Sequence, residues 1–129
     1  MNEIVKFIKD AGVFYIATLD GDKPRVRPFG FTMEYQKRIY FCTSNKKNVY
    51  RQLKSNPQFE ACTLSEDMKW IRLQGKAVFD SNTEAKDKAF EVMPGLAKIY
   101  KSEDFEVFYV EGIEATMYSM KDEPRTITL

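Results

Sequence analysis

The residues best suited to bind a ligand lie where a strand is expected to meet a short helix. Thr43 and Ser44 end the strand, and Lys46 and Lys47 stand in the first turn of the helix, for which Ser44 and Asn45 are favoured N-cap types. A cation at the positive end of a helix dipole costs about 0.3–1 kcal/mol. A bound phosphate would reverse that sign, because backbone N–H groups, hydroxyls and ammonium groups would all meet one anion. A phosphate site and a surface turn with two solvated lysines are both consistent with this stretch.

A second candidate is an interrupted strand expected from Pro24 to Met33. Its side chains alternate between two sets, Arg25, Arg27 and Phe29 on one face and Val26, Pro28 and Gly30 on the other. Proline within a strand indicates an edge or a bulge, where backbone N–H and C=O groups are free to meet a ligand. The alternative interpretation is an ordinary edge strand with solvated arginines.

Histidine is absent from all 129 residues, and this limits the chemistry. Serine–histidine and cysteine–histidine nucleophile pairs are excluded, together with most zinc and haem sites. The two cysteines, Cys42 and Cys62, lie within expected strands and lack the spacing of a metal or redox motif, which indicates packing roles. We therefore assign no catalytic side chain and no metal site. Redox chemistry would need an organic cofactor.

Length and composition indicate one globular domain over residues 1–129. The formal net charge is +1, so no broad field attracts nucleic acid or an anionic membrane. The hydrophobic fraction is 43%, with ten Phe and seven Tyr, which is typical of a sheet-rich protein. With no signal peptide, no membrane-spanning run and isolated cysteines in the sequence, we expect a cytoplasmic protein.

The elements that position these residues follow from hydrophobic periodicity and turn signals. Helices are expected over 2–11, from the turn at 44–45 to about 56, and over 81–93, where Ser81 and Glu84 form a capping box. Strands are expected over 13–19, 24–33, 38–43, 58–64, 69–80, 105–111 and 113–120, with bulges at Gly75 and Gly112. Residues 13–19 are apolar almost throughout, so both faces of that strand should be covered. The pattern predicts an α+β fold, and its number of strands suggests a closed barrel.

The order and spacing of these signals resemble those of the flavin-binding split-barrel proteins of the pyridoxamine 5′-phosphate oxidase-like superfamily, close to its general-stress and nitroimidazole-resistance-like branches. The likeness runs through nearly the whole chain and is carried by residues 14–19, 24–31, 39–44, 56–57, 70–75 and 94–100, with Lys47 and Leu53. It implies a six-stranded, mostly antiparallel split β-barrel with about three short helices. It also implies a homodimer with FMN in a groove at the interface.

The resemblance assigns binding roles to the two candidate stretches. In such proteins the irregular strand borders the flavin ring, which places Arg25, Val26, Arg27 and Pro28 beside it. The strand–turn–helix takes the phosphate, which assigns that group to Thr43, Ser44, Lys46, Lys47 and Asn48. Trp70 matches a position that often touches the flavin, and the region around Tyr118 is expected to contribute from the partner subunit. The implied activity is that of a flavin-dependent oxidoreductase acting on an unidentified small molecule.

Other interpretations stay open beside this one. A flavin-binding sensor or carrier would use the same site without turnover, and a deazaflavin presents the same phosphate and flat ring as FMN. A barrel binding a nucleic acid strand on an aromatic, basic face is disfavoured by the near-zero net charge. The lack of histidine argues against pyridoxamine phosphate oxidation, nitroimidazole reduction and haem binding, each of which relies on a histidine in proteins of this superfamily.

Overall fold

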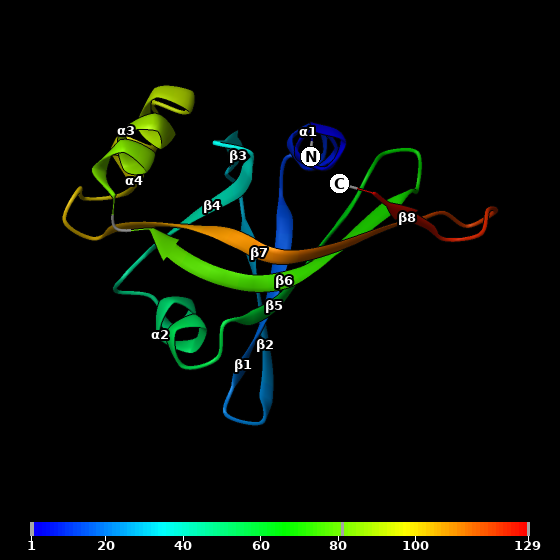
Figure 1. Ribbon diagram of the computed structural model, residues 1–129, viewed down its shortest axis with the longest axis horizontal. Coiled ribbons are helices and arrows are strands. Elements are labelled where there is room, and N and C mark those ends of the chain that lie inside the picture. Colours follow the sequence, from blue (N-terminus) through cyan, green and yellow to red (C-terminus); the bar gives the residue numbers. More distant parts are fainter. Residues whose placement is uncertain (1, 81, 129) are drawn as a thin grey trace.

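The computed structural model describes residues 2–80 and 82–128 and shows an α+β fold (Figure 1). Its helices are α1 (Asn2–Ala11), α2 (Asn48–Ser55), α3 (Thr83–Val92) and α4 (Leu96–Ile99). Its strands are β1 (Phe14–Asp20), β2 (Lys23–Phe29), β3 (Thr32–Tyr35), β4 (Arg38–Ser44), β5 (Gln58–Leu64), β6 (Trp70–Asp80), β7 (Phe105–Tyr118) and β8 (Arg125–Ile127). The fold class is as expected, but this part of the chain holds eight strands and four helices rather than six and three. None of the described helices is both long and apolar enough to cross a membrane.

The strands form one antiparallel sheet that is not closed. Their order is β2-β1-β5-β6-β7-β4-β3, and β8 pairs with β7 beside this path. Within the described residues β2 and β3 end the sheet without pairing with each other, so the expected closed barrel is not formed by hydrogen bonding. The reason lies at Gly30 and Phe31, where the single strand expected over 24–33 breaks in two. β2 pairs with β1, whereas β3 turns away and pairs with β4.

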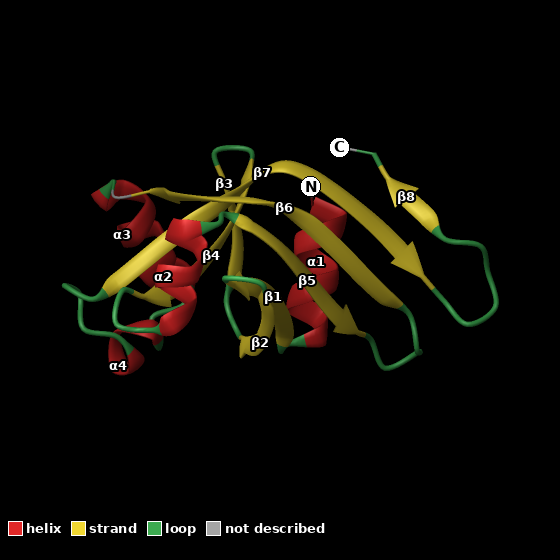
Figure 2. Cartoon of the chain, turned by 90° about the horizontal axis from the view of Figure 1, so that it is seen from below, coloured by secondary structure: helices red, strands yellow, loops and turns green. Residues whose placement is uncertain are grey.

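β6 and β7 form the longest pair and connect the two ends of the molecule. Figure 1 shows the two strands running side by side across the molecule, with α3 and α4 at one end and β8 at the other. Figure 2 shows the same curved ribbon from below. The pairing shifts register between Gln74 and Lys76, which confirms the bulge expected at Gly75. β7 continues through Gly112, whose φ is 67°, as one strand rather than the two expected. Glycines at these positions permit the bend.

Two apolar clusters hold the helices on the sheet. The larger one joins α1 and α2 to the inner face of the sheet and contains Phe41 and Phe108, fully buried with ring centroids 5.6 Å apart. The smaller one lies under α3 and α4 and includes Leu96 and Phe105. Fully burying a side chain of this size contributes about 1.5–3 kcal/mol. The clusters therefore hold α2 and α4 on either side of β4, the strand that carries the expected phosphate-binding turn.

The end of α3 differs from the sequence expectation. The spacing of apolar residues in the helix expected over 81–93 predicts that Val92 and Met93 lie on its inner face, but they are 40% and 39% exposed. Both residues line a cavity, and hydrophobic periodicity does not distinguish a core contact from the wall of a cavity. At the other end of α3, the expected capping residue Ser81 lies outside the described residues. Asn82 is the N-cap, and its side chain accepts a hydrogen bond from the backbone N–H of Glu84.

One face of the sheet remains uncovered on β1 and β2. Phe14 and Ile16 of β1 are buried, whereas Tyr15 between them is 49% exposed. On the neighbouring strand Val26 is 67% exposed. The expectation that both faces of residues 13–19 are covered is therefore wrong for a single chain. α1 and α2 pack on the inner face, whereas α3 and α4 pack against β3, β4 and β7 and do not cover the outer face of β1.

Candidate functional site

Two adjoining pockets lie around the end of β2 and the start of α2. The first, which we call the cationic pocket, has a volume of about 680 Å³ and lies between the β1–β2 hairpin and α2. The second, which we call the slot, is an apolar pocket of about 170 Å³ between β2, β4 and α4. Arg27, Lys47 and Val49 line both pockets, so a single ligand can extend from one into the other.

Positive charge dominates the cationic pocket. Arg25, Arg27, Lys47 and Arg51 line it together with one described carboxylate, Asp20. Arg25 is paired with that carboxylate, with Nε 3.5 Å from Oδ2. In the part of the chain that the structure describes, neither Arg27 nor Lys47 forms an ion pair. The remaining positive charge favours an anionic ligand group.

Arg27 is held in place by uncharged acceptors. Its Nη1 donates to Ile16 O at 3.1 Å and to Thr18 Oγ1 at 2.8 Å. Its Nη2 donates to Gln52 Oε1 at 2.6 Å, and the Thr18 hydroxyl donates to the same oxygen at 2.6 Å. Burial lowers the pKa of Arg27, but an arginine remains protonated at neutral pH. The network thus ties β1, β2 and α2 together around a guanidinium whose charge is not neutralised.

α2 begins without a side-chain cap. Its N-cap residue is Lys47, which makes no capping hydrogen bond, and the first turn holds no acidic residue. The N-cap expected at Ser44 or Asn45 is wrong, because both side chains act earlier in the turn. Ser44 Oγ accepts from the Lys46 N–H at 3.1 Å, and Asn45 Nδ2 donates to Glu106 Oε2 at 3.0 Å. The positive end of the helix dipole is therefore left at the cationic pocket with a lysine beside it.

The slot contains a buried hydroxyl without a partner. Thr43 is 1% exposed, and its Oγ1 makes no hydrogen bond within the described residues. Buried polar groups are nearly always paired, so this hydroxyl indicates that a ligand or water belongs beside it. Burial raises the pKa of the neighbouring Cys42 thiol to about 12, an effect that the Tyr100 hydroxyl and the Lys47 ammonium group only partly oppose. The thiol is therefore protonated at neutral pH and is a poor nucleophile.

Seven of the ten predicted binding residues line these pockets. They are Arg25, Val26, Arg27, Pro28, Thr43, Lys47 and Asn48. Ser44 is buried beside Thr43 and shapes the turn, but it lines neither pocket, and neither does Lys46.

Trp70 is not brought to these pockets within one chain. Trp70 is the first residue of β6, and the pockets lie near the last residue of that strand, Asp80. Asp80 pairs with Val107 of β7, and the neighbouring β7 residue, Glu106, pairs with Thr43. The Trp70 ring stacks on Tyr118, with centroids 5.5 Å apart and an interplanar angle of 7°.

Other lining residues were not anticipated from the sequence. Arg51 and Gln52 of α2 line the cationic pocket, and Leu96, Ile99 and Tyr100 form the wall of the slot contributed by α4 and its C-cap residue. Arg51 was detectable as a third cation close to the start of α2. Gln52 was not, because its partner Thr18 is 34 residues away in the sequence.

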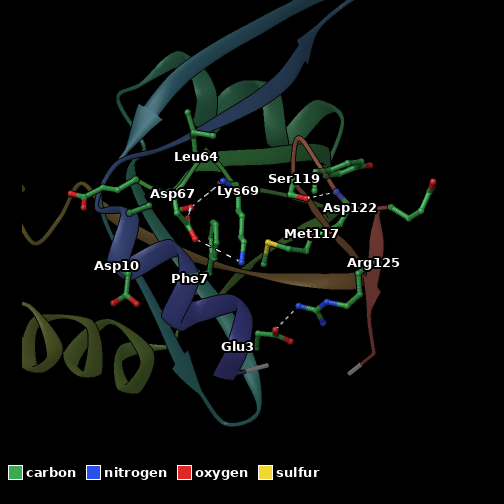
Figure 3. A pocket seen from close by; sticks show the side chains of 15 residues that line it. Glu3, Phe7, Asp10, Leu64, Asp67, Lys69, Met117, Ser119, Asp122 and Arg125 are labelled. Carbon is green, nitrogen blue, oxygen red and sulfur yellow. Dashed lines mark hydrogen bonds and ion pairs between the residues drawn. The ribbon is translucent and has the colours of Figure 1, made fainter.

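A larger hollow at the other end of the sheet has the opposite charge (Figure 3). It has a volume of about 860 Å³ and is lined by six carboxylates, from Glu3, Asp10, Glu66, Asp67, Asp122 and Glu123. Its cations are paired with them, since Arg125 Nη2 lies 2.8 Å from Glu3 and Lys69 Nζ lies 3.7 Å from Asp67. This hollow is therefore unsuited to a phosphate, despite its size.

Comparison with known proteins adds a family model and solved structures. The family model described as pyridoxamine 5′-phosphate oxidase matches residues 1–119. No curated protein sequence matches the chain. A solved NimC/NimA family protein from Clostridium acetobutylicum is 38% identical with a TM-score of 0.95, and the match covers 100% of this chain and 92% of that one.

More distant structures share the fold alone. The General Stress Protein 26 from Bacillus anthracis is 17% identical with a TM-score of 0.72, over 98% of this chain and 100% of that one. The heme storage protein HutZ from Vibrio cholerae is 17% identical with a TM-score of 0.68, over 86% of this chain and 90% of that one.

Proposed function

Because the chain belongs to the pyridoxamine 5′-phosphate oxidase family, we propose that it binds FMN and acts as a flavin-dependent oxidoreductase on a small molecule. In this proposal residues 1–129 act as a single FMN-binding domain. FMN joins a phosphate to a flat ring through a short polar chain, so it needs a cationic site next to an apolar one. The observation that carries the proposal is the junction of the cationic pocket and the slot at Arg27 and Lys47.

The phosphate is assigned to the cationic pocket. Lys47 and Arg27 provide charges without an ion-pair partner among the described residues, and the uncapped start of α2 provides backbone N–H groups. Arg25 and Asn48 line the same pocket. Ser44 supports the turn through its hydrogen bond to the Lys46 N–H, and we assign Lys46 no contact of its own with the phosphate.

The ring is assigned to the slot and the adjoining part of β2. Pro28 lines the slot, and Val26 lines the neighbouring cationic pocket on the same edge strand. The orphaned Thr43 hydroxyl provides a hydrogen bond for a polar atom of the ring. At about 170 Å³ the slot is smaller than the roughly 300–1,000 Å³ of pockets that enclose drug-sized ligands. One chain therefore covers only part of a flavin.

We propose that a second copy of the chain covers the rest. Residues 13–19 have the continuous apolar character of a strand covered on both faces, yet Tyr15 on the outer face is half exposed. Pairing register places Tyr15 opposite Pro28 on one side and Cys62 on the other, which puts all three on this outer face. Packing against the same face of a partner would cover the apolar surface next to the slot.

On this outer face, Trp70 can contact the flavin of the other subunit. Cys62 pairs with Arg72, so the side chain of Arg72 lies on the outer face as well. Trp70 is two residues away on the same strand and therefore shares this face, together with Tyr118, with which it pairs and stacks. In a symmetric dimer this stacked pair is available to the flavin of the other subunit. This arrangement explains how Trp70 can be a cofactor residue although it lies far from the pockets of its own chain.

When bound, FMN supplies the transfer of hydride or single electrons, which requires no general base from the protein. The role of the chain is to hold the cofactor and to tune its charge. Arg27, positioned by Thr18 and Gln52, favours negative charge on the bound ligand. The apolar residues of the slot exclude water from the side of the ring that they cover.

Three alternatives to this proposal differ in how well the residues fit them. A flavin carrier without turnover would use the same two pockets. A deazaflavin also fits their chemistry. A haem group fits the residues less well, because the sequence contains no histidine and burial keeps the Cys42 thiol in the slot protonated.

The decisive experiment begins with the visible spectrum of the purified protein and mass spectrometry of whatever denaturation releases. We expect flavin bands and FMN. A Soret band would identify haem, and a different mass would identify a deazaflavin. If the protein is colourless, FMN and riboflavin are titrated separately. FMN should bind at least about 100-fold more tightly, because two charge-assisted hydrogen bonds to phosphate are worth about 1.5–3 kcal/mol each.

Equal affinity for FMN and riboflavin would refute the phosphate assignment. Addition of NADH or NADPH to the FMN-loaded protein then separates an oxidoreductase from a carrier. Only the former passes electrons from the nicotinamide to the flavin, which bleaches the flavin bands until an added acceptor reoxidises the cofactor. Strongly salt-dependent binding of a single-stranded oligonucleotide by a colourless protein would instead support a nucleic-acid function.

A further inference from the structure

Thr32 carries a second buried hydroxyl without a partner. Among the buried side-chain polar atoms of the described residues, only the Oγ1 atoms of Thr32 and Thr43 lack a hydrogen bond. Such atoms are rare in folded proteins, and each one calls for an explanation. The proposed FMN site accounts for Thr43. Thr32 is the first residue of β3 and lies outside that site.

Thr32 lines a cavity of about 350 Å³ between the ends of α1 and α3. Ile8, Phe14 and Val92 provide apolar walls, and Lys9 provides a cation without an ion-pair partner in the described part of the chain. Small-molecule sites are typically mostly apolar, have a few polar groups and measure roughly 300–1,000 Å³. The cavity meets all three criteria for a small ligand.

This cavity adjoins the slot. Gly30 and Met93 line both, so a molecule in the cavity would lie next to a ring in the slot. A Cβ atom added to Gly30 would meet no other atom within 4 Å, so there is open space beside the backbone at this shared position. Met93 is 39% exposed, and a methionine side chain changes rotamer easily.

We infer that this cavity is the substrate subsite and that it takes a small aromatic molecule carrying a carbonyl or carboxylate oxygen. The apolar walls accept the aromatic ring, the Thr32 hydroxyl donates a hydrogen bond to the oxygen, and Lys9 favours its negative charge. The place of the subsite beside the flavin rests on the proposed function. Occupation of the cavity itself does not require FMN.

The test uses benzoate, an aromatic carboxylate that is inert to redox chemistry, and the protein without added flavin. Binding is followed by NMR through the methyl groups of Ile8 and Met93, which line the cavity. In Gly30→Leu the new side chain occupies the open space at the wall, and we expect benzoate to bind at least about tenfold more weakly. Gly95→Leu is the matched control, because Gly95 also faces open space but lines neither the cavity nor the slot.

A second pair of variants tests the hydroxyl. Thr32→Val removes the hydrogen-bond donor and should weaken benzoate binding about fivefold, whereas Thr32→Ser should retain it. The inference is overturned if benzoate moves neither methyl signal, or if Gly30→Leu and Thr32→Val bind it like the wild type. FMN binding is titrated separately in each variant. Benzoate binding without FMN binding would refute the proposed function and leave the cavity assignment standing, while the reverse result would refute the cavity alone.

Discussion

Replacing Lys47 with alanine is the most direct test of the cationic pocket, and Lys46 provides its matched control. The two lysines are adjacent in the sequence, yet only Lys47 lines the cationic pocket and the slot. Neither forms an ion pair in the described part of the chain. A charge-assisted hydrogen bond is worth about 1.5–3 kcal/mol, so Lys47→Ala should weaken FMN binding roughly 10- to 100-fold. Lys46→Ala removes a cation near the phosphate but no contact, and its effect should stay near twofold.

The assay is a fluorescence titration of each variant with FMN and with riboflavin, at low and at high salt. Riboflavin lacks the phosphate, so the Lys47→Ala change should leave its affinity nearly unaltered. Any residual effect of Lys46→Ala on FMN is a longer-range charge effect and should disappear at high salt, because exposed charges are screened there. Thermal unfolding of both variants without ligand checks that the fold is intact.

Two results would refute this reasoning. If the two single variants weaken FMN binding equally, the pocket geometry does not decide which lysine binds the phosphate. If Lys47→Ala weakens riboflavin as much as FMN, the lysine acts on the ring or on the fold, and the phosphate lies elsewhere.

Three further predictions follow from the same structure. Thr43→Val should raise the free energy of unfolding without ligand by about 1–3 kcal/mol in a urea titration, because it removes an unpaired buried hydroxyl, and it should also weaken FMN binding. Cys42→Ala should reduce the loss of stability between pH 8.5 and 9.5. The folded pKa of Cys42 is raised to about 12, so only the unfolded thiol ionises in this window, which lowers the wild-type stability by about 1 kcal/mol between these two pH values. Trp70→Ala should weaken FMN binding at the site of the other subunit. When it is co-refolded with Lys47→Ala, each mixed dimer should regain one intact site, because one of its two sites combines an unaltered Lys47 with an unaltered Trp70. A mixture that binds FMN no better than its components would contradict the shared site.

The Thr43 prediction separates a binding role from a structural one. A threonine whose side chain served only for packing would lose nothing on replacement by valine, which has nearly the same shape. An unpaired hydroxyl kept for a ligand has a stability cost in the free protein, and it is expected at a binding site rather than in a core. An increase in stability accompanied by unchanged FMN affinity would leave the hydroxyl without the proposed role.

Much of the fold could be predicted from the sequence because the signals are local. The Asp-Gly turn between β1 and β2, the glycine at residue 75 and the α+β class all follow from turn chemistry and side-chain alternation. The interruption at Gly30 was visible as an irregularity, but its consequence was not. Whether the chain continues in the same sheet or crosses to the opposite edge depends on which strands β2 and β3 find as partners, and those partners lie elsewhere in the sequence.

The candidate site divides in the same way. By itself the sequence determined that cations and hydroxyls cluster at the start of α2 and that no histidine is available, since residue types and spacing suffice for both statements. Only the tertiary structure decided that Lys47 and not Lys46 faces the pocket, that Thr43 is unpaired, and that Trp70 lies far from its own slot. Those properties depend on the direction of side chains and on contacts between residues far apart in the chain, such as Thr18 with Gln52, and local periodicity carries no information about either.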